Sequence, residues 1–385
     1  MRAVLDVARF DPQPGLDATR GERQPGQSGG RRLQRYEIEM PEGSTVLEAL
    51  MAVQDELDGT LAFRRACRHA ICGSCGMRIN GCAKLACNTQ VSVAMAQAAD
   101  MARSPGHPTP VAAARAGAAR DGAARDGAGG DGATGDGAAR DGVDQRAAAG
   151  DDGAPGVLIE PLGNMMVVKD LVTDMDDFWA RLRERRPWLF PPAAAPGPDD
   201  EFLVSPKQAD VLAQGVLCLE CGICYSDCNA VAAEPRFVGP AALVKAHRYS
   251  FDPRDEAVHE RAVDLAGQHG LWECMRCYFC TQRCPKHLRV RELIAQLGEL
   301  GVREGLDADP GARHAQAFVD SLRRSGRLNE TDLAVKSQGL GWTLQRLPLA
   351  VRVALAGKLA LPPRPIDDHD ALLAVIARAE QEEQP

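Results

Sequence analysis

Cysteine residues at metal-ligand spacing dominate the chemistry of this chain. One group has C-x4-C-x2-C spacing with a fourth cysteine downstream, and two groups have C-x2-C-x2-C-x3-C spacing. Thiolates are the preferred ligands of iron–sulfur clusters, and loops with two intervening residues let neighbouring sulfurs converge on one core. The sequence therefore predicts three clusters and a protein that conducts electrons. The three groups are Cys67, Cys72, Cys75 and Cys87, then Cys218, Cys221, Cys224 and Cys228, then Cys274, Cys277, Cys280 and Cys284.

The two later groups are predicted to exchange ligands. In two-cluster ferredoxins the fourth cysteine of each run binds the cluster of the other run. The rule assigns one [4Fe–4S] cluster to Cys218, Cys221, Cys224 and Cys284. It assigns the other cubane-type cluster to Cys228, Cys274, Cys277 and Cys280.

Zinc is the alternative occupant, because C-x2-C pairs also bind that metal. Zinc rarely uses the longer spacings found here, and thiols clustered in a reducing compartment are metal ligands more often than disulfides. Gly73 and Gly76 flank ligands of the first group and allow the backbone to approach inorganic sulfur closely. Cys82 is left over, either as an incidental small residue or as a redox-sensitive thiol or substitute ligand.

The elements around the first group read as a small mixed fold. Residues Arg35–Met40 alternate like a strand, and Ser44 is placed to cap a helix over Thr45–Asp55. Gly76–Asn80 is predicted as another strand, with a tight turn at Asn80 and Gly81 before the fourth cysteine.

Residues 101–155 change to Ala, Gly, Asp and Arg with a five-residue period, which cannot bury a core. A solvated linker is predicted. The regularly spaced aspartates suggest calcium, but their period differs from that of calcium-binding β-roll repeats. These aspartates are Asp121, Asp126, Asp131, Asp136 and Asp141.

The region after this linker is predicted to be mainly helical. Val157–Ile159 is strand-like and Lys169–Arg186 reads as a helix, followed by a proline-rich connector over 191–198. Gly239 and Pro240 open a helix that reaches His247, and Val290–Leu300 is helical after the third group.

The composition excludes several classes of protein. The net charge is -8, and no run is basic enough to indicate nucleic acid as a partner. Residues Met1–Asp6 are interrupted by charge too early for a secretory signal, which favours the cytoplasm. The longest apolar stretch, Leu347–Leu361, contains two cations and falls short of the roughly 20 residues of a spanning helix. A packed amphipathic helix is the simpler interpretation, and contact with a membrane or a partner is the alternative.

Together these segments resemble the iron–sulfur subunit of succinate dehydrogenase and fumarate reductase. The resemblance covers most of the chain, and it is specific only as a combination. The segments that carry it are Leu61–Gly81, Ile159–Leu162, Val168–Val172, Pro187–Leu189, Phe237–Ala241 and Cys284–Lys286.

The resemblance implies an α+β protein. A β-grasp plant-type ferredoxin domain over residues 1–100, with 11–33 as a loop, would hold a [2Fe–2S] cluster on the first group. After the linker over 101–155, an α-helical ferredoxin domain over 156–305 would hold two cubane-type clusters, and residues 306–385 would form a helical tail. FAD and the dicarboxylate chemistry belong to a partner flavoprotein, so no catalytic residue is expected in this chain.

The chain also departs from the familiar form of that subunit. The position of Cys277 is not cysteine there, and the last cluster is [3Fe–4S]. The extra ligand favours a second [4Fe–4S] here, with [3Fe–4S] as the alternative. Asn229, Ala233 and Met275 stand where the familiar form has quinone-site residues, so a quinone pocket of that design is not expected.

The C-terminal part resembles the tail of heterodisulfide-reductase-type dicluster subunits. This implies a heterodisulfide-reductase-like or membrane-anchor partner that reacts with quinone, and a peripheral position on the inner face of the cell membrane. The tail either docks such a partner or forms a capping helix pair on its own domain. The resembling segments are His314–Val319, Gly326–Glu330, Leu347–Leu349 and Gly357–Leu359. A subunit of another flavin oxidoreductase, acting on glycolate or glycerol phosphate or of heterodisulfide-reductase type, is the alternative function.

Overall fold

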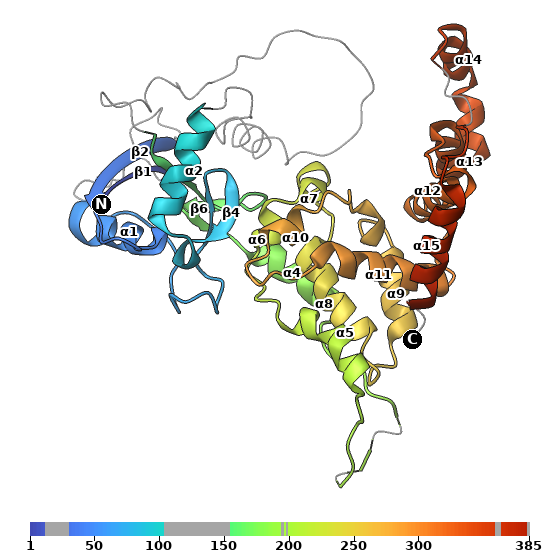
Figure 1. Cartoon of the computed structure of the whole chain (residues 1–385). Coiled ribbons are helices and arrows are strands. Elements are labelled where there is room, and N and C mark those ends of the chain that lie inside the picture. Colours follow the sequence, from blue (N-terminus) through green and yellow to red (C-terminus); the bar gives the residue numbers. More distant parts are fainter. Residues whose placement is uncertain (12–30, 104–154, 194–195, 198, 359–362, 383–385) are drawn as a thin grey trace, which may run out of the picture. The chain divides into compact units, whose positions relative to one another are not determined.

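The computed structural model describes residues 1–11, 31–103, 155–193, 196–197, 199–358 and 363–382 (Figure 1). It divides into two compact units. The first holds Met1–Glu256 and Met275–Ile294, and the second holds Ala257–Cys274 and Ala295–Pro385. The domain boundaries expected at residues 100, 155 and 305 stay predictions. The calcium hypothesis and most of the predicted linker lie outside the described residues.

A five-stranded mixed sheet forms the framework of the first unit. Its order is β2-β1-β5-β3-β4. The central strand, β5, runs parallel to β1 and antiparallel to β3, and all four of its residues are buried. The strands are β1 (Arg2–Arg9), β2 (Arg32–Glu39), β3 (Gly76–Ile79), β4 (Cys82–Leu85) and β5 (Val157–Glu160). This sheet and the helices described below confirm the α+β layout.

Strand β2 is longer than the sequence predicts. It pairs with β1 from end to end, with Arg9 opposite Arg32 and Arg2 opposite Glu39. The loop predicted over 11–33 is therefore wrong at its C-terminal end, because Arg32 and Leu33 belong to the strand. The sequence pattern did not reveal β1, the strand that pairs with β2. Because β1 has buried residues that face the core, its hydrogen bonds extend β2 to Arg32.

Two helices and two short turns complete the sheet domain. They are α1 (Val46–Ala52), the π-helical turn η1 (Val53–Leu57), the 3-10 turn η2 (Ala86–Asn88) and α2 (Val91–Arg103). The predicted cap at Ser44 is wrong. Thr45 caps α1, because its hydroxyl accepts the N–H of Glu48 while the Glu48 carboxylate accepts the N–H of Thr45.

The turn predicted at Asn80 and Gly81 is confirmed. Both residues have positive φ, 50° and 74°, and Ile79 pairs with Cys82 across the hairpin. Two successive positive φ values give a hairpin turn whose twist matches that of the strands. Cys82 is thus the first residue of β4.

The helix predicted over Lys169–Arg186 is wrong in its first half. Strands β6 (Val167–Lys169) and β7 (Val172–Thr173) form a small hairpin, and helix α4 begins only at Asp176 and ends at Glu184. Asp170 lies in the hairpin turn with φ 46°, and its buried carboxylate accepts the Arg9 Nε–H and the Ala62 N–H at 2.9 Å each. These long-range bonds prevail over local helix propensity.

The rest of the first unit is helical. Helix α8 confirms the helix predicted from Pro240 and extends it to Ser250. Helix α11 confirms the helix predicted from Val290 and extends it to Arg303. The helices are α5 (Pro206–Val216), α6 (Ile223–Ser226), α7 (Asn229–Ala233), α8 (Pro240–Ser250), α10 (Phe279–Arg283) and α11 (Val290–Arg303), the last of which continues into the second unit.

The second unit contains a helical tail. Within it α12 and α13 lie side by side, and α15 packs on α12 (Figure 1). The predicted packing of the apolar stretch is wrong for α14, which buries none of its residues. Its elements are α9 (Val258–Ala266), η4 (Leu271–Glu273), α12 (Pro310–Ser325), α13 (Glu330–Gln345), α14 (Leu347–Leu355) and α15 (His369–Glu382). In the described part of the chain, no helix has the length and apolar character needed to cross a membrane.

Candidate iron–sulfur sites

The structure brings together the four cysteines of the first group. Cys67, Cys72 and Cys75 lie in the loop between η1 and β3, and Cys87 lies in η2. The Cys72 N–H donates to Cys67 Sγ at 3.3 Å, and the Ala70 N–H donates to Cys87 Sγ at 3.3 Å. The Cys87 thiol lies close enough to Cys75 to influence its pKa. Sulfurs surrounded by inward N–H groups are the donor set that an iron–sulfur core uses.

The loop that carries these cysteines turns through left-handed backbone conformations. Arg68, Ala70 and Gly73 have φ values of 62°, 60° and 74°. Residues other than glycine adopt this region at a cost of about 1 kcal/mol or more each. Such turns make successive N–H groups face a common concave side, which stabilises negative charge there.

Two cysteines of the first group have opposite electrostatic environments. The N–H groups of His69, Cys72 and Ile71 point at the Cys67 sulfur and lower the pKa of that thiol to about 6. Burial, in contrast, raises the pKa of Cys75 to about 12. Cys67 is therefore prepared as a thiolate, whereas Cys75 needs a nearby positive charge, such as iron, to lose its proton.

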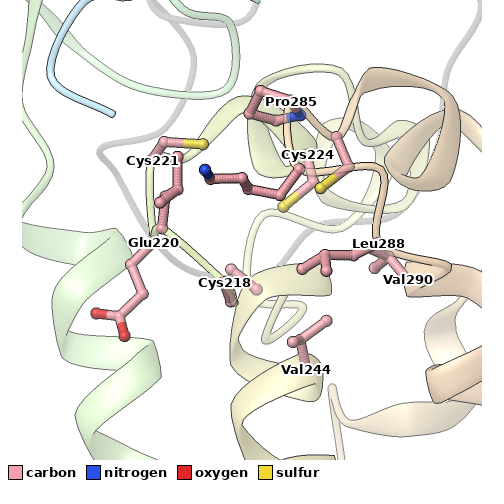
Figure 2. A pocket seen from close by; sticks show the side chains of 12 residues that line it. Cys218, Glu220, Cys221, Cys224, Val244, Pro285, Leu288 and Val290 are labelled. Carbon is pink, nitrogen blue, oxygen red and sulfur yellow. The ribbon is translucent and has the colours of Figure 1, made fainter. Parts of the chain in front are cut away.

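A second site is a cavity between α8 and the loops of the two later groups (Figure 2). Its empty volume is about 370 Å³, which includes space open to solvent. Four cysteines line it, three from the second group and one, Cys284, from the end of the third. The cysteines are Cys218, Cys221, Cys224 and Cys284, and the apolar lining includes Ala241, Val244, Leu288 and Val290.

The thiols of this cavity are held in a dry environment. Burial raises the pKa of Cys221 to about 12, raises that of Cys218, and places that of Cys224 well above the ordinary value. The neighbouring cysteine sulfurs add to the effect. A cavity with several thiols and a mainly apolar wall suits a cluster whose own iron supplies the positive charge.

The two C-x2-C loops share one backbone pattern. In the second group Glu220 and Gly222, on either side of Cys221, have φ values of 55° and 75°. In the third group Arg276 and Tyr278 take 55° and 63°. The same left-handed residues before and after the middle cysteine indicate that each loop turns its N–H groups in the same way.

The first site packs directly against the second. A Cβ added at Gly73 would lie 2.5 Å from Cys221 Cβ and 3.1 Å from Cys221 Cα. Only glycine allows this approach. From the sequence, Gly73 was expected to let the backbone approach inorganic sulfur, and the structure places it against Cys221. Ligand loops of the first and second groups therefore touch through backbone.

A buried aspartate connects the same two regions. Asp227, between Cys224 and Cys228, accepts the Ala83 N–H of β4 at 2.9 Å and the Arg283 Nε–H of α10 at 3.1 Å. Its side chain is 7% exposed. Sequence reasoning missed this residue, although a charge between two ligand cysteines was the signal that could have identified it.

Asn164 makes a further connection that sequence reasoning missed. Its side-chain amide donates to the carbonyl oxygens of Tyr225, Ser226 and Cys228 at 2.9, 3.1 and 3.0 Å. With φ 57° it stands where asparagine is better tolerated than most residues. The loop before β6 is thus tied to the backbone that leads to Cys228.

The remaining cysteines are placed one by one. Cys228 and Cys280 are buried, Cys277 is exposed and Cys274 is half-buried. Cys274 belongs to the second unit and the other three to the first. The grouping of these four residues on one cluster stays a prediction. Cys82 is half-buried in β4 and is not among the residues that line the cavity.

Two protein families match the two sites. A model described as a 2Fe-2S iron-sulfur cluster binding domain matches residues 5–113, which include the whole first group. A model described as a 4Fe-4S dicluster domain matches residues 216–288, which include the second and third groups.

Whole-chain relatives extend this similarity. The chain is 31% identical to the fumarate reductase iron-sulfur subunit of Mycobacterium tuberculosis over 74% of this chain and 87% of that protein. It is 30% identical to the 8-methylmenaquinol:fumarate reductase iron-sulfur subunit of Wolinella succinogenes over 83% of each chain. The fold is similar to a chain of the Mycobacterium smegmatis Sdh1 complex in the apo form, with a TM-score of 0.55, 22% identity and coverage of 80% and 98%.

Replacing Gly73 by alanine tests the contact between the two sites. We expect Gly73→Ala to lower the urea midpoint of the anaerobic protein and its iron content, because the new Cβ meets a backbone that cannot move freely. Left-handed strain contributes about 1 kcal/mol and overpacking about 1–3 kcal/mol.

Gly43→Ala is the matched control. Gly43 has φ 84°, but nothing lies within 4 Å of the position that a Cβ would take there, so this variant carries the backbone strain without the clash. An equal loss of midpoint and iron in both variants would show that the approach to Cys221 is unimportant.

Proposed function

Because the chain belongs to the fumarate reductase and succinate dehydrogenase family of iron–sulfur subunits, we propose that it carries electrons singly between a flavoprotein and a quinone-reacting partner. The role as electron-transfer subunit of such an oxidoreductase follows from the family. The partners, the ligand sets and the nature of the last cluster are the proposed parts.

The contact of Gly73 with Cys221 carries the proposal. It brings the ligand loop of the first group against the ligand loop of the second, so two redox centres held there would be joined by a short covalent and van der Waals path. Iron–sulfur clusters would supply one-electron chemistry at these sites. The chain's own residues hold the sulfurs, line the second site with apolar side chains and fix the distance between the two sites.

The first site is proposed to bind [2Fe–2S] through Cys67, Cys72, Cys75 and Cys87. The N–H donors that face these sulfurs support it, and such hydrogen bonds favour the reduced, more negative state of a cluster. We interpret the surrounding sheet as a β-grasp domain, on the basis of its parallel pairing of β1 and β5.

The cavity site is proposed to bind [4Fe–4S] through Cys218, Cys221, Cys224 and Cys284. Its lining supports this crossed set, because Cys284 is far from the second group in sequence and yet lines the same cavity. The other crossed set, Cys228, Cys274, Cys277 and Cys280, is proposed from the spacing and from the shared backbone of the two loops. The helical region is accordingly interpreted as an α-helical ferredoxin domain.

Serine variants test the crossed ligands. We expect Cys284→Ser to alter the same EPR signal as Cys218→Ser in the reduced anaerobic protein, and to leave unaltered the signal that Cys274→Ser changes. Cys82→Ser is the matched control and should leave all signals intact. A Cys284→Ser spectrum that instead matches Cys274→Ser would contradict the crossed arrangement.

The last cluster is proposed to be [4Fe–4S], because Cys277 supplies a fourth thiol. Its exposure allows ligation without displacing a buried group. Redox-titrated EPR of the undamaged oxidised protein should therefore lack a [3Fe–4S] signal. If that signal is present at one spin per chain before any exposure to air, the role assigned to Cys277 is wrong.

The partners are inferred from the family. We propose a flavoprotein with FAD and the dicarboxylate site, and a membrane-anchor or heterodisulfide-reductase-like subunit, which together would keep the chain at the inner face of the cell membrane. The named relatives support this as iron-sulfur subunits of fumarate reductases, one of them acting with 8-methylmenaquinol.

Co-purification tests the assignment. A tagged full chain isolated anaerobically from its own cells should bring down a flavoprotein, and the complex should oxidise succinate with an artificial dye or reduce fumarate. The clusters should be reduced by succinate or reoxidised by fumarate in the same preparation. Glycolate or glycerol-phosphate activity without succinate or fumarate activity would assign the subunit to another flavoenzyme.

A further inference from the structure

Helix α14 exposes apolar side chains that a packed helix would cover. Leu347, Val351 and Leu355 are spaced four residues apart and so lie on one helix face. Their exposed fractions are 54%, 49% and 84%. Leu344, directly before the helix, is 68% exposed. This row of side chains forms an apolar surface on the tail.

The segment that contains α14 begins at a break in α13 and ends where the chain is anchored on α12. Gly339, with φ 81°, breaks α13 ahead of it. The chain returns at Ile366, whose N–H donates to the Ser325 carbonyl at 3.0 Å and whose side chain packs at Gly326. Figure 1 shows α14 beyond the α12–α13 pair. The C-terminal end of the projection is therefore held by the end of α12.

The charge of this segment is opposite to that of the whole chain. From Gly341 to Ile366 the sequence contains no Asp or Glu, while the protein as a whole has a net charge of -8. The four cations of the segment are Arg346, Arg352, Lys358 and Arg364. In the described part of the tail, these cations make no ion pair, whereas Lys336 in α13 pairs with Asp320 and Asp332.

An aromatic residue stands at the start of the projection. Trp342 is 39% exposed, and the Arg346 guanidinium lies 5.4 Å from the centre of its ring. Tryptophan beside cations, next to an apolar helix face, is the composition of helices that lie in a membrane–water interface.

We propose that α14 and its basic flanks bind directly to the surface of a bilayer that contains anionic phospholipid. The nine residues of α14 are too few to cross a bilayer, which takes about 20 residues, so the helix would lie along the surface. Its leucine and valine side chains enter the headgroup boundary, and the four cations meet lipid phosphates. Charge complementarity favours this partner over an apolar protein groove, which would not use these four cations.

Vesicle sedimentation tests the proposal with the full chain purified anaerobically. The protein should pellet with vesicles of phosphatidylcholine and phosphatidylglycerol, and much less with phosphatidylcholine alone. Added salt should weaken the binding, because ions screen the attraction. Visible absorbance of the protein shows that each sample is intact.

Two double variants distinguish binding through the tail from a general effect of the protein's net charge. Arg352→Gln with Lys358→Gln should weaken binding by about fivefold for each cation removed. Lys207→Gln with Arg303→Gln removes two exposed cations outside the segment and should leave binding unchanged. Leu355→Asp should abolish most binding to either vesicle while cluster absorbance stays the same.

Two results would overturn the proposal. One is that the intact protein does not bind anionic vesicles. The tail variants would then be expected to weaken association with a protein partner or with a second copy of the chain instead. The other is binding that the Lys207 and Arg303 pair reduces as much as the Arg352 and Lys358 pair.

Discussion

The close packing of Gly73 on Cys221 is the constraint on which the first unit depends. A backbone without a side chain lets one cysteine loop touch another. The sheet and the helices must then be held at a fixed separation, since a shift of about 1 Å would open the contact or produce a clash. Gly222 and Gly76 lie against the same seam, where Met165 and the Cys221 carbonyl are their neighbours.

Polar side chains keep that separation. Asp227 accepts hydrogen bonds from β4 and α10, and Asn164 donates to three carbonyl groups that precede or include Cys228. Buried polar groups whose hydrogen bonds are all made have one favourable arrangement and many unfavourable ones, so they specify geometry more than they add stability.

Burial also raises the pKa of Glu160 at the end of β5. The nearby charge of Arg78 partly offsets this rise in pKa.

Charge is distributed unevenly along the chain. The cysteine loops contain positively charged residues such as Arg68, and the sulfurs they surround are prepared as thiolates by N–H groups or kept as thiols by burial. In the segment from Gly341 to Ile366, cations and exposed leucines occur together without acids. A single chain therefore combines a mainly apolar cavity for one proposed redox site with an exposed, basic segment elsewhere.

The sequence by itself determined the local features, because they depend on neighbouring residues. Cysteine spacing, the turn at Asn80 and the helices that begin at Pro240 and Val290 are set by short-range geometry. Long-range contacts decided the rest. The parallel pairing of β5 with β1, the hairpin at Asp170 and the presence of Cys284 in the cavity of the second group join residues far apart in the chain. Spacing suggested the crossed set, but only tertiary packing could bring its sulfurs to one cavity or leave α14 uncovered, since both depend on which surfaces meet.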